Sequence, residues 1–145
     1  MQYKILLIDD DQDDRDLFID AATLISDEIE ITTLESGVSL VTDLNNEVVK
    51  IPDLIFLDIN IPEMDGWTCL SLLKENEKYA FIPVIMYSTS HHKEDIKRAK
   101  EAGALTYLSK PYDFKELTKA LEEITAHLIN GTIKELTFDS KSFFE

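Results

Sequence analysis

No apolar run in the sequence approaches the roughly 20 residues that a helix needs to cross a bilayer. Residues 1–9 also lack the apolar core and cleavage site of a secretory signal. The single cysteine, Cys69, cannot form an internal disulfide. These absences argue against a membrane-spanning protein and a disulfide-stabilised secreted one, so we expect a cytoplasmic protein.

Basic residues are scarce as well. Fourteen lysines and arginines stand against 29 aspartates and glutamates, which gives a formal net charge of -15. Such a charge repels nucleic acid phosphates and anionic lipid headgroups. We therefore expect neither direct nucleic acid binding nor membrane association.

Short apolar segments alternate with longer amphipathic ones along the chain. The apolar segments predict five strands, at residues 4–8, 30–34, 53–57, 82–87 and 105–108. The amphipathic segments predict helices at 37–45, 66–76, 92–102 and 113–129, after a first helix with Leu17, Phe18, Ala21, Leu24 and Ile25 on one face. This alternation is typical of a doubly wound α/β fold, in which helices cover both faces of a parallel sheet.

The composition of the strands predicts their order in the sheet. Residues 5–8, 54–57 and 84–86 are unbroken apolar runs and belong in the middle, whereas Thr32, Thr33 and Thr106 suit edge strands. The resulting order is 2-1-3-4-5. In that order a crevice opens at the carboxyl ends of the first and third strands, where α/β sheets bind ligands.

The last helix has clear signals at both ends. Asp113 and Glu116 form a potential capping box, and Asn130-Gly131 is a typical helix stop. Residues 1–130 are therefore predicted to form one domain, followed by a C-terminal extension at 131–145. The extension is rich in apolar residues, which predicts either packing back on the domain or partner binding: Ile133, Leu136, Phe138, Phe143 and Phe144.

Three carboxylates follow central strands. Asp9 and Asp10 end the first strand and Asp58 ends the third, so all three are expected at one edge of the sheet. Close carboxylates repel one another and must either take up protons or hold a cation. Oxygen ligands alone favour a hard ion such as Mg²⁺. The remaining acids of this run are interpreted as helix caps and as complements of the helix dipole: Asp11, Asp13, Asp14 and Asp16.

The same edge also receives a hydroxyl and an ammonium group. The fourth strand ends in Ser88-Thr89, and Lys110 follows the fifth strand. A carboxylate nucleophile, a divalent cation, a hydroxyl and a lysine together suit phosphoryl transfer, in which catalysis is mainly positioning and charge neutralisation.

Four segments in this order, 4–11, 52–66, 82–89 and 102–111, resemble the receiver domain of bacterial two-component response regulators, with its flavodoxin/CheY-like fold. The resemblance covers residues 4–129 and implies a role for each matching position. The phosphoacceptor falls on Asp58, and the metal ligands fall on Asp9, Asp10, Asp58 and the backbone carbonyl of Asn60. Lys110 and Ser88 match the groups that contact the phosphoryl oxygens, Tyr107 and Thr89 match the switch positions, and Lys110–Pro111 matches a cis peptide.

The resemblance also implies a mechanism. Asp58 takes a phosphoryl group from the phosphohistidine of a sensor histidine kinase or phosphotransfer protein, with Mg²⁺, and later loses it to water. The phosphoryl group draws Ser88 inward and opens space into which Tyr107 rotates. The face of the fourth helix, fifth strand and fifth helix then binds an unidentified protein partner, as a monomer or a phosphorylation-dependent homodimer. On this interpretation the protein is not an enzyme, because it catalyses only its own modification.

Two alternatives remain open. A haloacid-dehalogenase-type phosphohydrolase would use Asp9 and Asp11 as nucleophile and acid, but that resemblance wants threonine or valine where Asp13 stands. A structural adaptor would keep the receiver fold without being phosphorylated. A phosphorylation assay separates these from a receiver.

Overall fold

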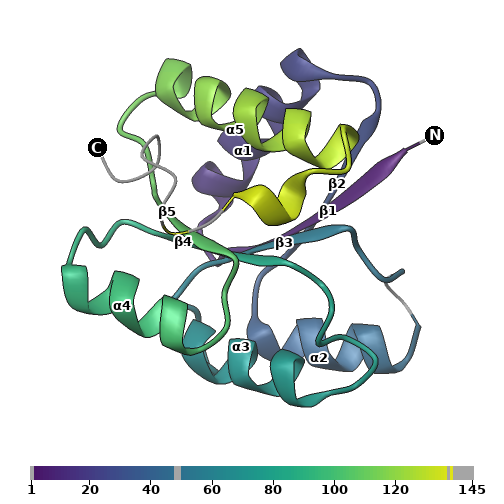
Figure 1. Cartoon of the computed structure of the whole chain (residues 1–145), viewed down its shortest axis with the longest axis vertical. Coiled ribbons are helices and arrows are strands. Elements are labelled where there is room, and N and C mark those ends of the chain that lie inside the picture. Colours follow the sequence, from purple (N-terminus) through teal and green to yellow (C-terminus); the bar gives the residue numbers. More distant parts are fainter. Residues whose placement is uncertain (1, 48–49, 137, 139–145) are drawn as a thin grey trace.

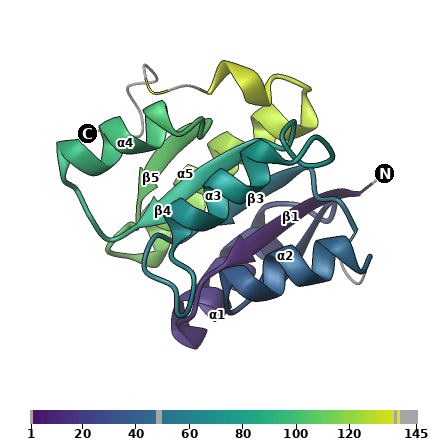
Figure 2. The ribbon, with the colours of Figure 1, turned by 90° about the horizontal axis from the view of Figure 1, so that it is seen from below.

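A computed structural model describes residues 2–47, 50–136 and 138 of the chain. Within these residues five parallel strands form one sheet in the order β2-β1-β3-β4-β5. Of these strands, β1, β3, β4 and β5 follow one another in this order across the molecule (Figure 2). The doubly wound α/β class and the strand order predicted from the sequence are therefore confirmed.

The helices and strands alternate along the whole described chain (Figure 1). The strands are β1 (Tyr3–Ile8), β2 (Ile29–Leu34), β3 (Leu54–Leu57), β4 (Val84–Ser88) and β5 (Thr106–Ser109). The helices are α1 (Gln12–Ile25), α2 (Gly37–Asn45), α3 (Gly66–Glu75), α4 (Lys93–Glu101), α5 (Phe114–Ile129) and the short 3₁₀ helix η1 (Ile133–Glu135). Each predicted strand and helix is present, with ends shifted by a few residues at most.

Helices cover both faces of the sheet, with α1 and α5 on one side and α2, α3 and α4 on the other (Figure 1). Each side has its own apolar core. Phe18 of α1 packs edge-to-face on Phe56 of β3 in the first core, and Leu70 of α3 lies in the second. Because side chains of the central strands alternate between these cores, β1, β3 and β4 are buried on both faces.

The helices begin where the sequence places capping residues. The side chains of Asp11, Asp65 and Asp113 accept hydrogen bonds from backbone N–H groups in the first turns of α1, α3 and α5. After α5, Gly131 adopts a φ of 74°, the left-handed conformation that ends helices. These caps fix where each helix leaves the carboxyl edge of the sheet.

The predicted apolar face of α1 is partly wrong. Leu17 and Leu24 are 46% and 71% exposed. In α1 the stripe toward the sheet instead includes Phe18, Ala21 and Ala22, which are buried. Leu17 and Leu24 lie seven residues apart on the flank of that stripe. They are exposed because a helix that packs on a sheet buries only one of its sides.

The described part of the C-terminal extension contacts the domain. Leu136 is 2% exposed and belongs to the core under α1 and α5, with Ile133 packed against it. Phe138 packs against the core on the other side of the sheet. Phe143 and Phe144 lie outside the described residues. Within the part of the chain that the structure describes, no helix has both the length and the apolarity of a membrane span.

Candidate functional site

The carboxylates of Asp9, Asp10 and Asp58 meet at the carboxyl edge of the sheet. Asp9 and Asp10 follow β1, and Asp58 follows β3, its direct neighbour. Each carboxylate offers an oxygen, and these oxygens lie within 4.8 Å of one another. Asp9 and Asp58 are buried, whereas Asp10 is exposed. The three acids that the sequence places at this edge are thus together, with one side open to solvent.

Lys110, which follows β5, extends its side chain to this cluster. Its Nζ lies 2.8 Å from Oδ2 of Asp9 and 3.0 Å from Oδ2 of Asp58. The Lys110 side chain is only 10% exposed, so both ion pairs are shielded from water. The ammonium group compensates part of the negative charge of the carboxylates. From the sequence we expected only bound protons or a bound cation as the source of this compensation.

Two further residues of α1 contact the site, and sequence reasoning missed both roles. Asp14 accepts a 2.9 Å hydrogen bond from Nζ of Lys110, although it was interpreted only as a complement of the helix dipole. Arg15 donates a 2.8 Å hydrogen bond to the backbone carbonyl of Asp9. The positions of these two residues could have indicated their roles. Helix α1 begins three residues after Asp9, so its first turn lies beside the strand ends.

Burial and charge shift the pKa values in this cluster. Burial raises the pKa of the Asp58 carboxyl from 3.8 to about 6; Asp9 adds to the rise, while Lys110 and the N–H of Asn60 oppose it. For Lys110, burial favours the neutral amine, but hydrogen bonds to Asp9 and Asp14 and the charge of Asp58 outweigh burial and raise its pKa above the ordinary value. The lysine therefore stays charged, whereas the Asp58 carboxyl loses its proton at a higher pH than an ordinary aspartate does.

The loop after Asp58 is held against the strand end by a close backbone approach. The N–H of Gly66 donates a 2.8 Å hydrogen bond to the carbonyl of Ile59, and the N–H of Asn60 donates a 3.2 Å bond to Oδ1 of Asp58. A Cβ on Gly66 would lie 2.2 Å from the Asp58 carbonyl oxygen. The φ of Gly66 is not positive, so lack of space rather than backbone conformation is the reason for glycine.

Hydroxyl groups border the cluster at the end of β4. Ser88 is buried and accepts a 3.2 Å hydrogen bond from the N–H of Ser90, while Thr89 is exposed. Leu57 pairs with Met86 in the sheet, so Ser88 lies one residue beyond the level of Asp58. The N–H of Lys110 donates a 2.7 Å bond to the carbonyl of Ser88, which joins the ends of β4 and β5.

Tyr107, which the resemblance places at a switch position, has a fully buried ring, and its hydroxyl donates a 2.9 Å hydrogen bond to the carbonyl of Ser90. The buried ring and this bond together stabilise the inward position. The Lys110–Pro111 peptide was expected to be cis but is trans, like every other peptide bond of the described chain. The trans form is the intrinsically favoured one, by about 0.5 to 1 kcal/mol, and Lys110 contacts the carboxylates with this peptide trans.

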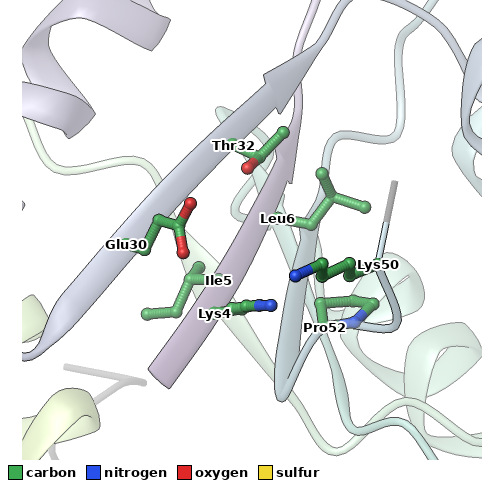
Figure 3. Close-up of a pocket in the computed structure, with 7 residues that line it drawn as sticks. All are labelled: Lys4, Ile5, Leu6, Glu30, Thr32, Lys50 and Pro52. Atoms are coloured by element: carbon green, nitrogen blue, oxygen red, sulfur yellow. The ribbon is translucent and has the colours of Figure 1, made fainter. Parts of the chain in front are cut away.

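A hollow of about 260 Å³ lies elsewhere, near the amino ends of β1 and β2 (Figure 3). Lys4 and Glu30, which are paired in the sheet, line it together with Thr32, Lys50 and Pro52, and the Lys4 side chain extends toward Lys50 and Pro52 (Figure 3). It is at the opposite end of β1 from Asp9 and contains none of the clustered carboxylates. It therefore plays no part in the chemistry of the carboxylate cluster.

Comparisons with known proteins agree with this arrangement. Response regulator Rcp1 from Synechocystis sp. is 31% identical over 124 residues, which cover 83% of this chain and 84% of Rcp1. The probable methanogenesis regulatory protein FilR2 from Methanothrix harundinacea is 36% identical over 75 residues, covering 52% of this chain. That match spans only 48% of FilR2.

Solved structures share the fold over most of the chain. The phosphorylated cyanobacterial phytochrome response regulator RcpA superposes with a TM-score of 0.83 at 26% identity, covering 90% of this chain and 96% of RcpA. The Mn²⁺-bound form of Rcp1 gives a TM-score of 0.77 at 30% identity, covering 86% and 92% of the two chains. The family model of the response regulator receiver domain matches residues 5–122. With its parallel sheet and acidic cluster, the chain belongs to the response regulator receiver domains of two-component systems.

Proposed function

We propose that the protein is a phosphoacceptor that carries a phosphoryl group on Asp58. The observation that supports this most is the geometry around Asp58. Its carboxylate lies 3.0 Å from the buried ammonium of Lys110 and within 4.8 Å of the acidic pair Asp9 and Asp10. Nucleophile, positive charge and metal-binding oxygens are thus in one place, as phosphoryl transfer requires. RcpA, a relative with the same fold, is described in a phosphorylated form.

The donor set suits a divalent cation, which we take to be Mg²⁺. Asp9, Asp10 and Asp58 offer only oxygen atoms, the ligands that hard cations prefer, and Asp10 is open to solvent where bound waters can complete the shell. The backbone carbonyl of Asn60 is the proposed fourth protein ligand. When bound, such an ion neutralises charge on the phosphoryl oxygens and on the carboxylates. Rcp1 has been described with Mn²⁺.

Asp58, Lys110 and Ser88 have separate roles in the proposed reaction. An oxygen of Asp58 attacks phosphorus and forms an acyl phosphate as the bond from phosphorus to its donor breaks. Lys110 forms an ion pair with one phosphoryl oxygen, and the hydroxyl of Ser88 donates a hydrogen bond to another phosphoryl oxygen. Water later attacks phosphorus, the bond from phosphorus to the Asp58 oxygen breaks, and inorganic phosphate leaves the regenerated carboxylate. The protein transforms no substrate other than the phosphoryl donor, so it is a signalling protein rather than an enzyme in the usual sense.

Switching is proposed to pass through Ser90. Its N–H contacts Ser88, its carbonyl accepts from Tyr107, and its hydroxyl lies 2.5 Å from a carboxylate oxygen of Asp95 in α4. A phosphoryl group that draws Ser88 and Thr89 toward Asp58 would therefore pull on α4 and β5 together. Helix α4 has Ala99 as its one buried residue, so it can shift at low cost.

The phosphoryl donor is proposed to be a sensor histidine kinase or a phosphotransfer protein in the cytoplasm. The output is proposed to pass to a protein partner through the face of α4, β5 and α5, with the protein as a monomer or a phosphorylation-dependent homodimer. The net charge of -15 supports a protein partner over nucleic acid or a membrane surface.

Incubation with acetyl phosphate and Mg²⁺, followed by intact mass measurement, tests this proposal. We expect the mass of one phosphoryl group to be added to the wild type and not to Asp58→Asn. An unmodified wild type would favour the adaptor alternative. An adduct that survives in Asp58→Asn but is lost in Asp9→Asn would favour the phosphohydrolase alternative.

A further inference from the structure

Lys110 has a third carboxylate partner besides Asp9 and Asp58. Its Nζ lies 2.9 Å from Oδ2 of Asp14, compared with 2.8 Å for Asp9 and 3.0 Å for Asp58. A lysine ammonium has three protons to donate, and here each one has a carboxylate acceptor. The position of the ammonium is therefore set by three anchors, and Asp14 is the only one of them supplied by a helix.

Asp14 differs from the other two partners in its surroundings. Among the described residues, the oxygens close enough to share a metal ion belong to Asp9, Asp10 and Asp58, and Asp14 is not one of them. Its side chain is 35% exposed, whereas those of Asp9 and Asp58 are nearly or fully buried. The N-cap side chain of Asp11 accepts a hydrogen bond from the N–H of Asp14, which fixes the backbone that carries it.

If the proposed function holds, this difference matters during the reaction. Asp9 and Asp58 are the carboxylates that a metal ion and a phosphoryl group engage, so their bonds to Lys110 are weakened or exchanged. A divalent cation beside these two residues also repels the ammonium. Asp14 binds neither the metal ion nor the phosphoryl group, so it can keep its hydrogen bond to Lys110 throughout the reaction.

We propose that Asp14 is a positioning residue that holds the Lys110 ammonium beside Asp58 while the metal and the phosphoryl group occupy the other carboxylates. It acts on the reaction through Lys110 and contacts neither the donor nor the reacting atoms. This inference rests on the proposed phosphorylation of Asp58.

The test compares Asp14→Asn with Asp13→Asn, a matched control. Both changes remove one negative charge from the first turn of α1, but Asp13 is exposed and its side chain has no contact with Lys110 in the structure. The rate of phosphorylation by acetyl phosphate is measured at saturating Mg²⁺ and donor. The half-saturating Mg²⁺ concentration is measured separately from the fluorescence of Trp67, the single tryptophan of the sequence, which lies in the first turn of α3.

Loss of a charge-assisted hydrogen bond predicts that Asp14→Asn lowers the saturated rate by about tenfold or more. We expect Asp13→Asn to stay within about twofold of wild type and Asp14→Glu to recover part of the rate. Both Asn variants should shift the Mg²⁺ midpoint similarly, because each loses one nearby charge. In a Lys110→Ala background, Asp14→Asn should have no further effect, since Asp14 acts through that lysine.

A readout that needs neither metal nor donor is the side-chain ammonium NMR signal of Lys110. Hydrogen bonding slows its exchange with water, so the signal should be visible in wild type and Asp13→Asn and broadened in Asp14→Asn. The inference is overturned if Asp14→Asn phosphorylates like Asp13→Asn, or if it slows the Lys110→Ala protein as strongly as wild type. In either case wild type still forms the adduct, so the proposed function stands; absence of the wild-type adduct would instead remove the proposed function itself.

Discussion

The hydroxyl of Tyr107 donates a 2.9 Å hydrogen bond to the backbone carbonyl of Ser90, although the ring is fully buried. The same carbonyl accepts a 3.2 Å bond from the hydroxyl of Ser109. Strand β5 is thus tied through two side chains to the loop that precedes α4. The buried position of Tyr107 therefore depends on contacts with the same loop that carries Ser90.

Tyr107→Phe should lower the free energy of unfolding by about 0.5 to 1.5 kcal/mol, because one buried hydrogen bond is lost while Ser109 still satisfies the Ser90 carbonyl. Urea unfolding measures the change. Tyr112→Phe serves as the control and should have no effect, since Tyr112 is 92% exposed. Equal stabilities of wild type and Tyr107→Phe would contradict the importance of this bond.

Gly66→Ala should destabilise the protein by about 1 to 3 kcal/mol or more, since the added methyl group meets the Asp58 backbone at 2.2 Å and only a shift of the loop can relieve the overlap. Gly37→Ala is the matched control at the start of α2, where the nearest atom is 3.3 Å away. We expect its effect to stay below about 1 kcal/mol. Thermal unfolding distinguishes the two, and equal effects would argue against a close approach at Gly66.

The raised pKa of Asp58 predicts a pH-dependent stability. Its value of about 6 in the folded protein exceeds the ordinary 3.8, so the folded state binds the proton more tightly than the unfolded state. The stability that this group contributes is complete below the unfolded pKa and is lost as the pH rises through about 6. Asp58→Asn should therefore gain stability relative to wild type, by about 1 to 3 kcal/mol, between pH 4 and pH 7.

Urea unfolding of both proteins across this range, with a chelator present, measures that difference. The comparison cancels the titration of the carboxylates that do not interact with Asp58, because they are common to the two proteins. A constant difference in unfolding free energy from acid to neutral pH would contradict the raised pKa.

Divalent metal should stabilise the folded protein, because the ion binds clustered carboxylates that exist only in that state. At a metal concentration about 100 times the dissociation constant the gain is about 2.7 kcal/mol. Asp10→Asn should remove most of this gain, since Asp10 is an exposed member of the cluster that makes no ion pair with Lys110 in the structure. Asp16→Asn, an exposed acid of α1 outside the cluster, should keep it. Thermal unfolding with and without Mg²⁺ measures the stabilisation of each variant. Equal stabilisation of Asp10→Asn and Asp16→Asn would argue against the assigned metal-binding cluster.

The strand order could be predicted because strands that are buried on both faces have a more apolar composition than a partly buried edge strand. Residues 5–8 of β1, 54–57 of β3 and 84–86 of β4 are uninterrupted apolar runs and are buried, whereas β2 is only partly buried. The faces of single helices were less predictable. Leu17 and Leu24 fit a helical apolar pattern, but which flank meets the sheet depends on the angle of α1, a property of the packed fold.

The meeting of Asp9, Asp10, Asp58 and Lys110 followed from topology, since parallel strands bring their carboxyl ends to one edge. The ion pair between Asp14 and Lys110 could not be predicted in this way. It depends on the path of a long side chain and on the rotation of the first turn of α1, neither of which is encoded in residue spacing. The same holds for the inward ring of Tyr107.

The central claim is that Asp58 forms an acyl phosphate. Its most direct test is reduction of the acetyl phosphate-treated protein with borohydride, which converts a phosphorylated aspartate to homoserine, followed by peptide mapping. We predict homoserine at position 58 and unchanged aspartate at positions 9 and 10. Homoserine at Asp9, or at no aspartate in a protein that carries the phosphoryl mass, would contradict the account.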